Sequence, residues 1–110
     1  MSHTVIHAGD IEVRHGIFRG LSEPLGVSVF RVNRLELAAG AEGLEHDHTA
    51  DGQEEVYAVV EGSGTLRVEG QEIALRPGHF VFCSPEARRQ MMAGDQGLVW
   101  IGIGAAGSSA

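Results

Sequence analysis

Short apolar runs separated by glycine and proline turns limit what this chain can fold into more than any other feature. The runs are of strand length, and a turn signal recurs about every eight to twelve residues. No window keeps a helical period over three turns. This pattern predicts an all-β sandwich or barrel. The expected strands are residues 27–32, 35–37, 55–60, 65–68, 72–75, 80–83 and 98–101.

Glycine occupies 16 of the 110 positions and falls between the expected strands. There it supplies the positive φ that tight hairpins need. We expect Gly62, Gly64, Gly94 and Gly97 to act in this way. Glycine therefore marks the turns of the predicted barrel.

The chain has the length of one domain. We expect residues 1–26 to form an N-terminal arm with short edge strands, 27–104 the barrel and 105–110 a flexible tail. A barrel of this size has a limited core, and the edge strands of the arm need a partner. We therefore expect a homodimer.

Charge and composition exclude several classes of function. The formal net charge is -7, whereas a nucleic-acid surface needs a basic patch and an anionic membrane attracts a polybasic segment. No lysine is present, which excludes a Schiff base and a phosphate-loop lysine. The single cysteine, Cys83, cannot form an internal disulfide, and its strand position predicts a buried structural thiol. Without the apolar stretch of a signal peptide, a cytoplasmic location is expected.

The segment His46-Asp47-His48 and the following Glu55 carry the strongest chemical signal. Residues two apart in a strand face the same side, so the two imidazoles can converge on one point. A hairpin return would bring Glu55 opposite them. Two imidazoles and a carboxylate form the facial triad that binds a divalent ion and leaves coordination positions open. A surface His-x-His pair without metal is the alternative.

The spacing around these residues resembles the first signature motif of the cupin family. Its positions are Gly40, His46, His48, Glu55 and Gly62. The strand and glycine turn at 55–64 and the turn at 76–78 continue the resemblance, which covers about residues 27–104. Six residues separate the second histidine from the glutamate, where the family has three or four. The resemblance implies a small antiparallel jelly-roll β-barrel, the double-stranded β-helix.

The second family motif departs from its usual pattern. Cupins carry a fourth ligand, a histidine, in this stretch, and alignment places Gln90 there as a weak ligand or an interior hydrogen-bonding group. Tyr57 and Val59 share the facing of Glu55 and are expected to line the substrate pocket. Arg88, or Arg89 beside it, would place a guanidinium at the barrel mouth for an anionic substrate.

Two functions remain open at this point. One is a metal-dependent enzyme that acts on a small molecule, with dioxygenase- or isomerase-type chemistry at one Fe, Mn, Ni or Zn ion. The other is a non-catalytic cupin that binds a small ligand and has a weak or empty metal site. The missing histidine favours the second, and no catalytic residue is assigned. The histidines of the N-terminal arm, His15 among them, are not expected in the site.

Overall fold

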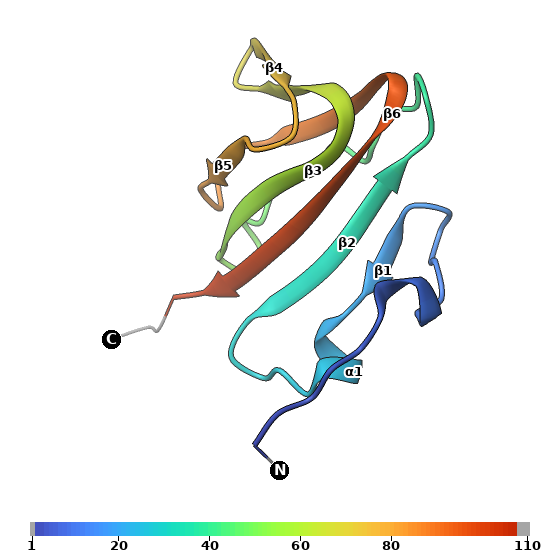
Figure 1. Ribbon diagram of the computed structural model, residues 1–110. Helices are drawn as coiled ribbons and strands as arrows, with labels where there is room; N and C mark the ends of the chain where they lie inside the picture. The colour runs from blue at the N-terminus through green and yellow to red at the C-terminus, as the bar shows by residue number, and fades with distance from the viewer. Residues whose placement is uncertain (1, 108–110) are drawn as a thin grey trace.

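The computed structural model describes residues 2–107 and consists mainly of β-strands (Figure 1). All strand pairs are antiparallel, in the order β1-β2-β6-β3-β4, with β5 also paired to β3. The predicted antiparallel jelly-roll class is confirmed. The elements are a 3-10 helix η1 (Ala8–Asp10), β1 (Phe18–Gly20), α1 (Ser22–Leu25), β2 (Arg31–Leu37), β3 (Gln53–Val68), β4 (Gln71–Leu75), β5 (Phe80–Cys83) and β6 (Arg89–Ala106).

Two long strands, β3 and β6, lie at the centre of the sheet and pair with all the other strands except β1. They pair along almost their whole length and curve over together (Figure 1). One half of this ladder pairs with β2 and β5, and the other half pairs with β4. The sheet thus bends over itself and encloses an apolar interior.

The bend requires glycines at positions where the sequence predicts turns. Gly62 and Gly64 lie inside β3, and Gly94 and Gly97 lie inside β6, so the expectation that they separate strands is wrong. The register shifts between Val59 and Glu61 and again between Gly62 and Gly64. Gly62 has a φ of 77°, and a Cβ there would lie 2.0 Å from the Gly97 carbonyl oxygen. Bulges of this kind curve a strand without ending it.

The interior contains the side chains that face inward from both halves of the ladder. Leu66 and Leu98 are 1% exposed, and Trp100 is 4% exposed. Cys83 is 2% exposed, which confirms the buried thiol. The remaining members of this core are Leu37, Tyr57, Val59, Leu75 and Met91.

The N-terminal arm is attached to the barrel of its own chain. β1 pairs with β2, and Ser22 of α1 bonds to the backbone of Val32. The arm therefore needs no second copy to pair its strand, and β2 starts at Arg31 instead of residue 27. β6 continues to Ala106, two residues past the expected barrel end, and residues 108–110 of the expected tail lie outside the described residues. The two helical segments between residues 2 and 107 are too short to cross a membrane.

Candidate metal centre

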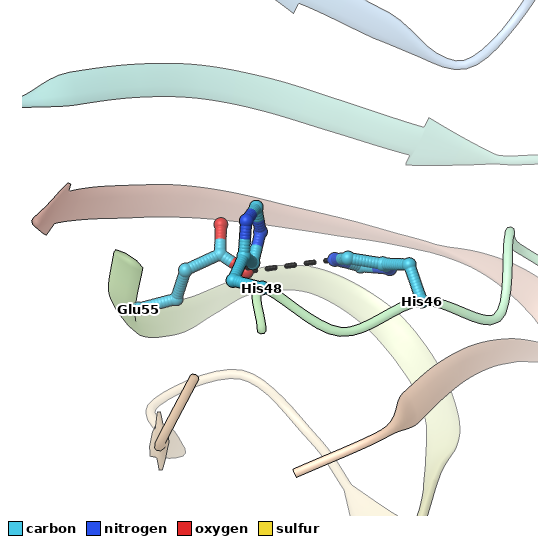
Figure 2. Close-up of side chains that lie close together, drawn as sticks. All are labelled: His46, His48 and Glu55. Carbon is cyan, nitrogen blue, oxygen red and sulfur yellow. Dashed lines mark ion pairs between the residues drawn. The ribbon is translucent and has the colours of Figure 1, made fainter. Parts of the chain in front are cut away.

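The two histidines of the motif lie on the segment that connects β2 to β3, and the start of β6 fixes them. His46 forms a two-way backbone bridge with Arg89, with both N–O distances 2.9 Å. The His48 amide donates to the Pro85 carbonyl at 2.8 Å. Glu55 stands near the beginning of β3. Backbone bonds thus hold both imidazoles in front of the carboxylate (Figure 2).

The three side chains come together as the sequence predicts. The Oε1 atom of Glu55 lies 3.5 Å from His46 Nε2 and 3.2 Å from His48 Nε2. All three donor atoms lie within 4.8 Å of one another. A divalent ion with ligands at about 2.1 Å places neighbouring donors about 3.0 to 3.5 Å apart. The group His46, His48 and Glu55 can therefore hold a metal ion.

The far nitrogen of each imidazole is anchored to an acceptor. His48 Nδ1 lies 2.9 Å from Asp51 Oδ1, and His46 Nδ1 lies 3.2 Å from the Leu44 carbonyl oxygen. Because a carbonyl and a carboxylate only accept, both Nδ1 atoms donate a proton. A metal-binding histidine is typically oriented by such an outer partner, which leaves Nε2 free for the ion.

With both imidazoles neutral and protonated at Nδ1, three acceptors face one another, whereas a proton on His46 Nε2 gives a hydrogen bond to Glu55. With the proton on Nδ1, each neutral imidazole presents a lone pair at Nε2, and Glu55 Oε1 also only accepts. Lone pairs at these separations repel unless a cation lies between them. Protonation of both rings would instead gather two imidazolium ions and the Arg89 guanidinium around one carboxylate oxygen. A single divalent ion satisfies all three acceptors at once.

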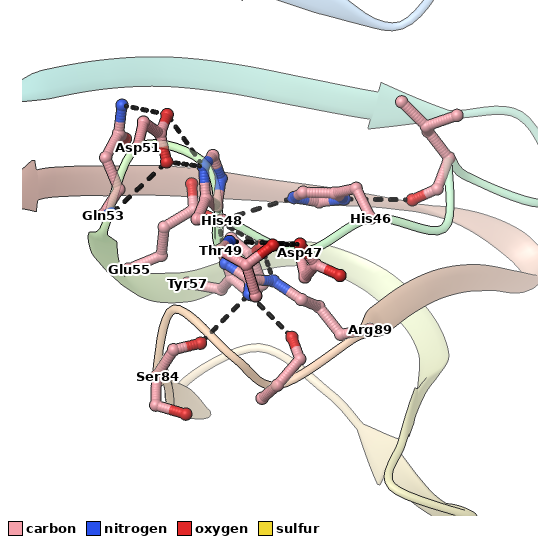
Figure 3. A network of polar contacts seen from close by, with 12 residues as sticks. His46, Asp47, His48, Thr49, Asp51, Gln53, Glu55, Tyr57, Ser84 and Arg89 are labelled. Atoms are coloured by element: carbon pink, nitrogen blue, oxygen red, sulfur yellow. Dashed lines mark hydrogen bonds and ion pairs between the residues drawn. The ribbon is translucent and has the colours of Figure 1, made fainter.

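The buried side chain of Arg89 binds the Glu55 carboxylate (Figure 3). Arg89 is 1% exposed, and its Nη2 donates to Glu55 Oε1. Its Nε donates to the Tyr57 hydroxyl at 3.0 Å, and Tyr57 donates to the same Glu55 oxygen at 2.6 Å. Nη1 donates to the carbonyls of Ser84 and Ala87 at 3.2 and 2.8 Å. Every nitrogen of Arg89 is occupied, so its role is to fix Glu55.

These contacts set the ionisation of the site. Burial alone would raise the pKa of Glu55, but hydrogen bonds from His46, Tyr57 and Arg89 lower that pKa to about 2. The hydrogen bond to Glu55 raises the pKa of His46. Burial, together with the nearby Glu55 charge, raises the pKa of Tyr57, which stays a phenol. The carboxylate is thus ready to bind a cation without releasing a proton.

Three residues expected in or near the site lie elsewhere. The amide nitrogen of Gln90 donates to the Gly43 carbonyl at 3.0 Å, as an interior hydrogen-bonding group does. Arg88 is exposed and pairs with Glu45 and Asp47. Val59 is 3% exposed and belongs to the core. Tyr57, by contrast, lines the cavity described below.

Arg89 is the site residue that the sequence reasoning placed incompletely. Neighbours along a strand face opposite sides, so a one-residue shift exchanges the inward and outward positions. At the start of β6, Arg89 and Met91 are buried, and Gln90 between them faces the other way. The alternation of Arg89 with Met91 is the signal that points inward.

The three donors open into a cavity of about 740 Å³. Strands β2, β3 and β6 form its floor, and the arm adds His15, Ile17 and Phe18 at its edge. The arm residue His15, which the sequence reasoning left outside the site, has a φ of 54° and packs its ring 5.9 Å from that of Phe18. No periodic pattern marks it in the sequence, because only the β1–β2 pairing brings the arm here.

An antiparallel barrel with a two-histidine, one-carboxylate group at its cavity defines the class of this protein. The Cupin domain family model matches residues 33–104, and the chain belongs to the cupin family. No curated protein matches the sequence.

Solved structures share the fold at low sequence identity. A cupin protein from Bacteroides fragilis is 22% identical, with a TM-score of 0.81, over 100% of this chain and 89% of that one. A predicted oxalate decarboxylase from Thermotoga maritima is 17% identical, with a TM-score of 0.78, over 94% and 99%. A sugar phosphate isomerase of the cupin superfamily from Silicibacter pomeroyi is 26% identical, with a TM-score of 0.72, over 82% and 59%. This chain thus spans little more than half of the isomerase.

Proposed function

We propose that this cupin binds one divalent metal ion through His46, His48 and Glu55 and acts there on a small molecule held in the cavity. The observation that carries the proposal is the convergence of one donor atom each from His46, His48 and Glu55 within 4.8 Å of one another. The ligand set suits Fe, Mn, Ni or Zn.

The residues around the donors have distinct roles in this proposal. His46 and His48 bind the ion, each oriented through its Nδ1 partner. Arg89 and Tyr57 keep Glu55 ionised and turned toward the histidines. A bound divalent ion supplies Lewis-acid polarisation of a substrate oxygen and, where the metal is redox-active, dioxygen chemistry. The isomerase and the predicted decarboxylase among the structural neighbours support small-molecule chemistry of this kind.

A non-catalytic cupin that binds a small ligand remains the second candidate. The Arg89 guanidinium contacts the same Glu55 oxygen that faces both imidazoles, and its charge opposes that of a metal ion. Among the histidine, cysteine and acidic side chains of residues 2–107, no fourth ligand joins the three donors. Both features favour weak metal binding.

Metal analysis of untagged protein tests the proposal. We expect about one equivalent of a divalent metal in the wild type and none in His48→Ala, with His3→Ala, outside the site, as the matched control. Bound metal stabilises the folded state, so a chelator should lower the melting temperature of the wild type and leave that of His48→Ala unchanged. Equal and negligible metal in all three proteins, after incubation with each candidate ion, would overturn the proposal. It would favour the second candidate.

A further inference from the structure

One wall of the cavity carries a positive charge that no residue neutralises. The ionisable residues of the lining, histidines aside, are Arg31, Arg89 and Glu55, two positive and one negative, although the whole chain has a net charge of -7. Arg89 is already paired with Glu55. Arg31 is exposed at the first position of β2 and forms no ion pair with any residue between 2 and 107. The cavity is therefore locally cationic in an acidic protein.

The strand register places Arg31 in line with Glu55 across the sheet. Arg31 of β2 stands opposite Gly104 of β6, and Gly104 stands opposite Glu55 of β3. Residues opposite one another share a face of the sheet. Two strand spacings separate the backbones of Arg31 and Glu55 by about 10 Å. A short molecule can reach from one to the other across Gly104.

The residue between them is a glycine, which the neighbouring side chains of β3 approach closely. A Cβ at Gly104 would lie 2.9 Å from Gln53 Oε1 and 3.1 Å from Glu55 Cγ. Gly102, two residues earlier on the same face, likewise lines the cavity. The part of β6 between the arginine and the donor group thus carries no side chain of its own, and the side chains of Gln53 and Glu55 lie over Gly104.

A buried donor in the same cavity lacks an acceptor. Trp100 is 4% exposed and lines the cavity, yet its Nε1 has no hydrogen-bond partner among the residues that the structure describes. An indole nitrogen can only donate, and a buried donor without an acceptor is costly. Apolar side chains, such as Leu35 and Met91, make up much of the remaining lining.

From this placement we propose that the cavity binds a small organic carboxylate with an apolar body, whose carboxylate pairs with Arg31. The proposal rests on the proposed function, because the opposite end of the molecule, a carbonyl oxygen, lies toward His46, His48 and Glu55. One guanidinium matches one carboxylate in a bidentate pair. Asn33 and Gln53 also line the cavity and can bind hydroxyls, so a sugar phosphate is the competing anion that the titrations separate from the carboxylate.

The single tryptophan of the chain reports on this cavity directly. The probes are 5-oxohexanoate, its neutral methyl ester and ribose 5-phosphate, titrated against Trp100 fluorescence and the melting temperature. Chelated and zinc-loaded protein are titrated separately. We expect saturable binding of the acid, at least tenfold weaker binding of the ester and the sugar phosphate, and at least tenfold weaker binding of the acid to Arg31→Gln.

Two matched variants complete the experiment. Arg76→Gln removes an exposed arginine outside the cavity and should bind the acid like the wild type, and Arg31→Lys should retain part of the affinity. Any of four results would overturn the proposal. They are equal binding of the acid and the ester, equal binding of the acid by the wild type and Arg31→Gln, tighter binding of the sugar phosphate than of the acid, and no binding of the acid up to 10 mM, which is on the order of weak millimolar affinity. Failure of zinc to alter any titration would count against the metal site alone, because the Arg31 contact is measured in chelated protein.

Discussion

Replacing Arg89 by methionine removes the cation that holds Glu55 while keeping an apolar side chain of similar length in the interior. In the folded protein the pKa of Glu55 falls from 4.5 to about 2. At about 1.4 kcal/mol for each pH unit by which a pKa moves, the favourable surroundings of the carboxylate amount to about 3 kcal/mol near pH 7. Because the pKa of Glu55 is lowered, its carboxylate stabilises the fold fully at pH values above the ordinary carboxyl pKa of 4.5. This stabilisation is lost as the pH falls toward 2.

Arg89 supplies one of three hydrogen bonds that lower this pKa and is itself buried, so we expect Arg89→Met to cost about 2 to 3 kcal/mol. For a domain of this size, that corresponds to a melting temperature about 10 °C lower. Urea unfolding in chelated protein at pH 7 measures the change. Arg88→Met is the matched control, because ion pairs between exposed side chains contribute little to stability.

A double-mutant cycle with Glu55→Gln separates the pair from the loss of packing. Glu55→Gln alone leaves the buried guanidinium without its counter-ion and should also destabilise the fold. The double variant should be at least about 1 kcal/mol more stable than the sum of the single effects predicts. Additive effects, or an Arg89→Met cost no larger than that of Arg88→Met, would refute the ion pair as the force that positions Glu55.

Four further outcomes follow from the fold. Gly62→Ala should cost at least about 3 kcal/mol in urea unfolding, because its Cβ meets the Gly97 carbonyl at 2.0 Å, whereas Gly70→Ala, with nothing within 4 Å, should cost only about 1 kcal/mol for its positive φ. Equal losses would contradict the packing argument. Gln90→His should leave metal affinity unchanged, since Gln90 bonds to the Gly43 carbonyl, and tighter metal binding would place residue 90 at the site. The Cys83 thiol should react with a thiol reagent only on unfolding, and rapid labelling of native protein would count against its burial. Light scattering should give a homodimer mass, on the ground of the limited core alone, and a mass of 11.7 kDa would exclude it.

Local sequence patterns predict the barrel and some of its strand boundaries, but not the places where a strand bends without ending. Strand-length apolar runs correctly predict β4 and β5, where a turn residue ends each run. They fail at Gly62 and Gly94, since a glycine that ends a strand and one that bends it look alike in sequence. The distinction depends on which backbone approaches the glycine, here the Gly97 carbonyl beside Gly62.

The sequence by itself determined the antiparallel barrel, the convergence of His46 and His48 and the recruitment of Glu55. The barrel follows from the strand-length runs, and its antiparallel form and the grouping of the three residues follow from the spacing of the cupin-like motif, although His46 and His48 lie between β2 and β3 and not on a strand. Only the tertiary structure decided that Arg89 faces the carboxylate and that Arg31 lies in line with it across Gly104. Both depend on the register between strands far apart in sequence, and a shift of one residue would turn each side chain to the opposite face.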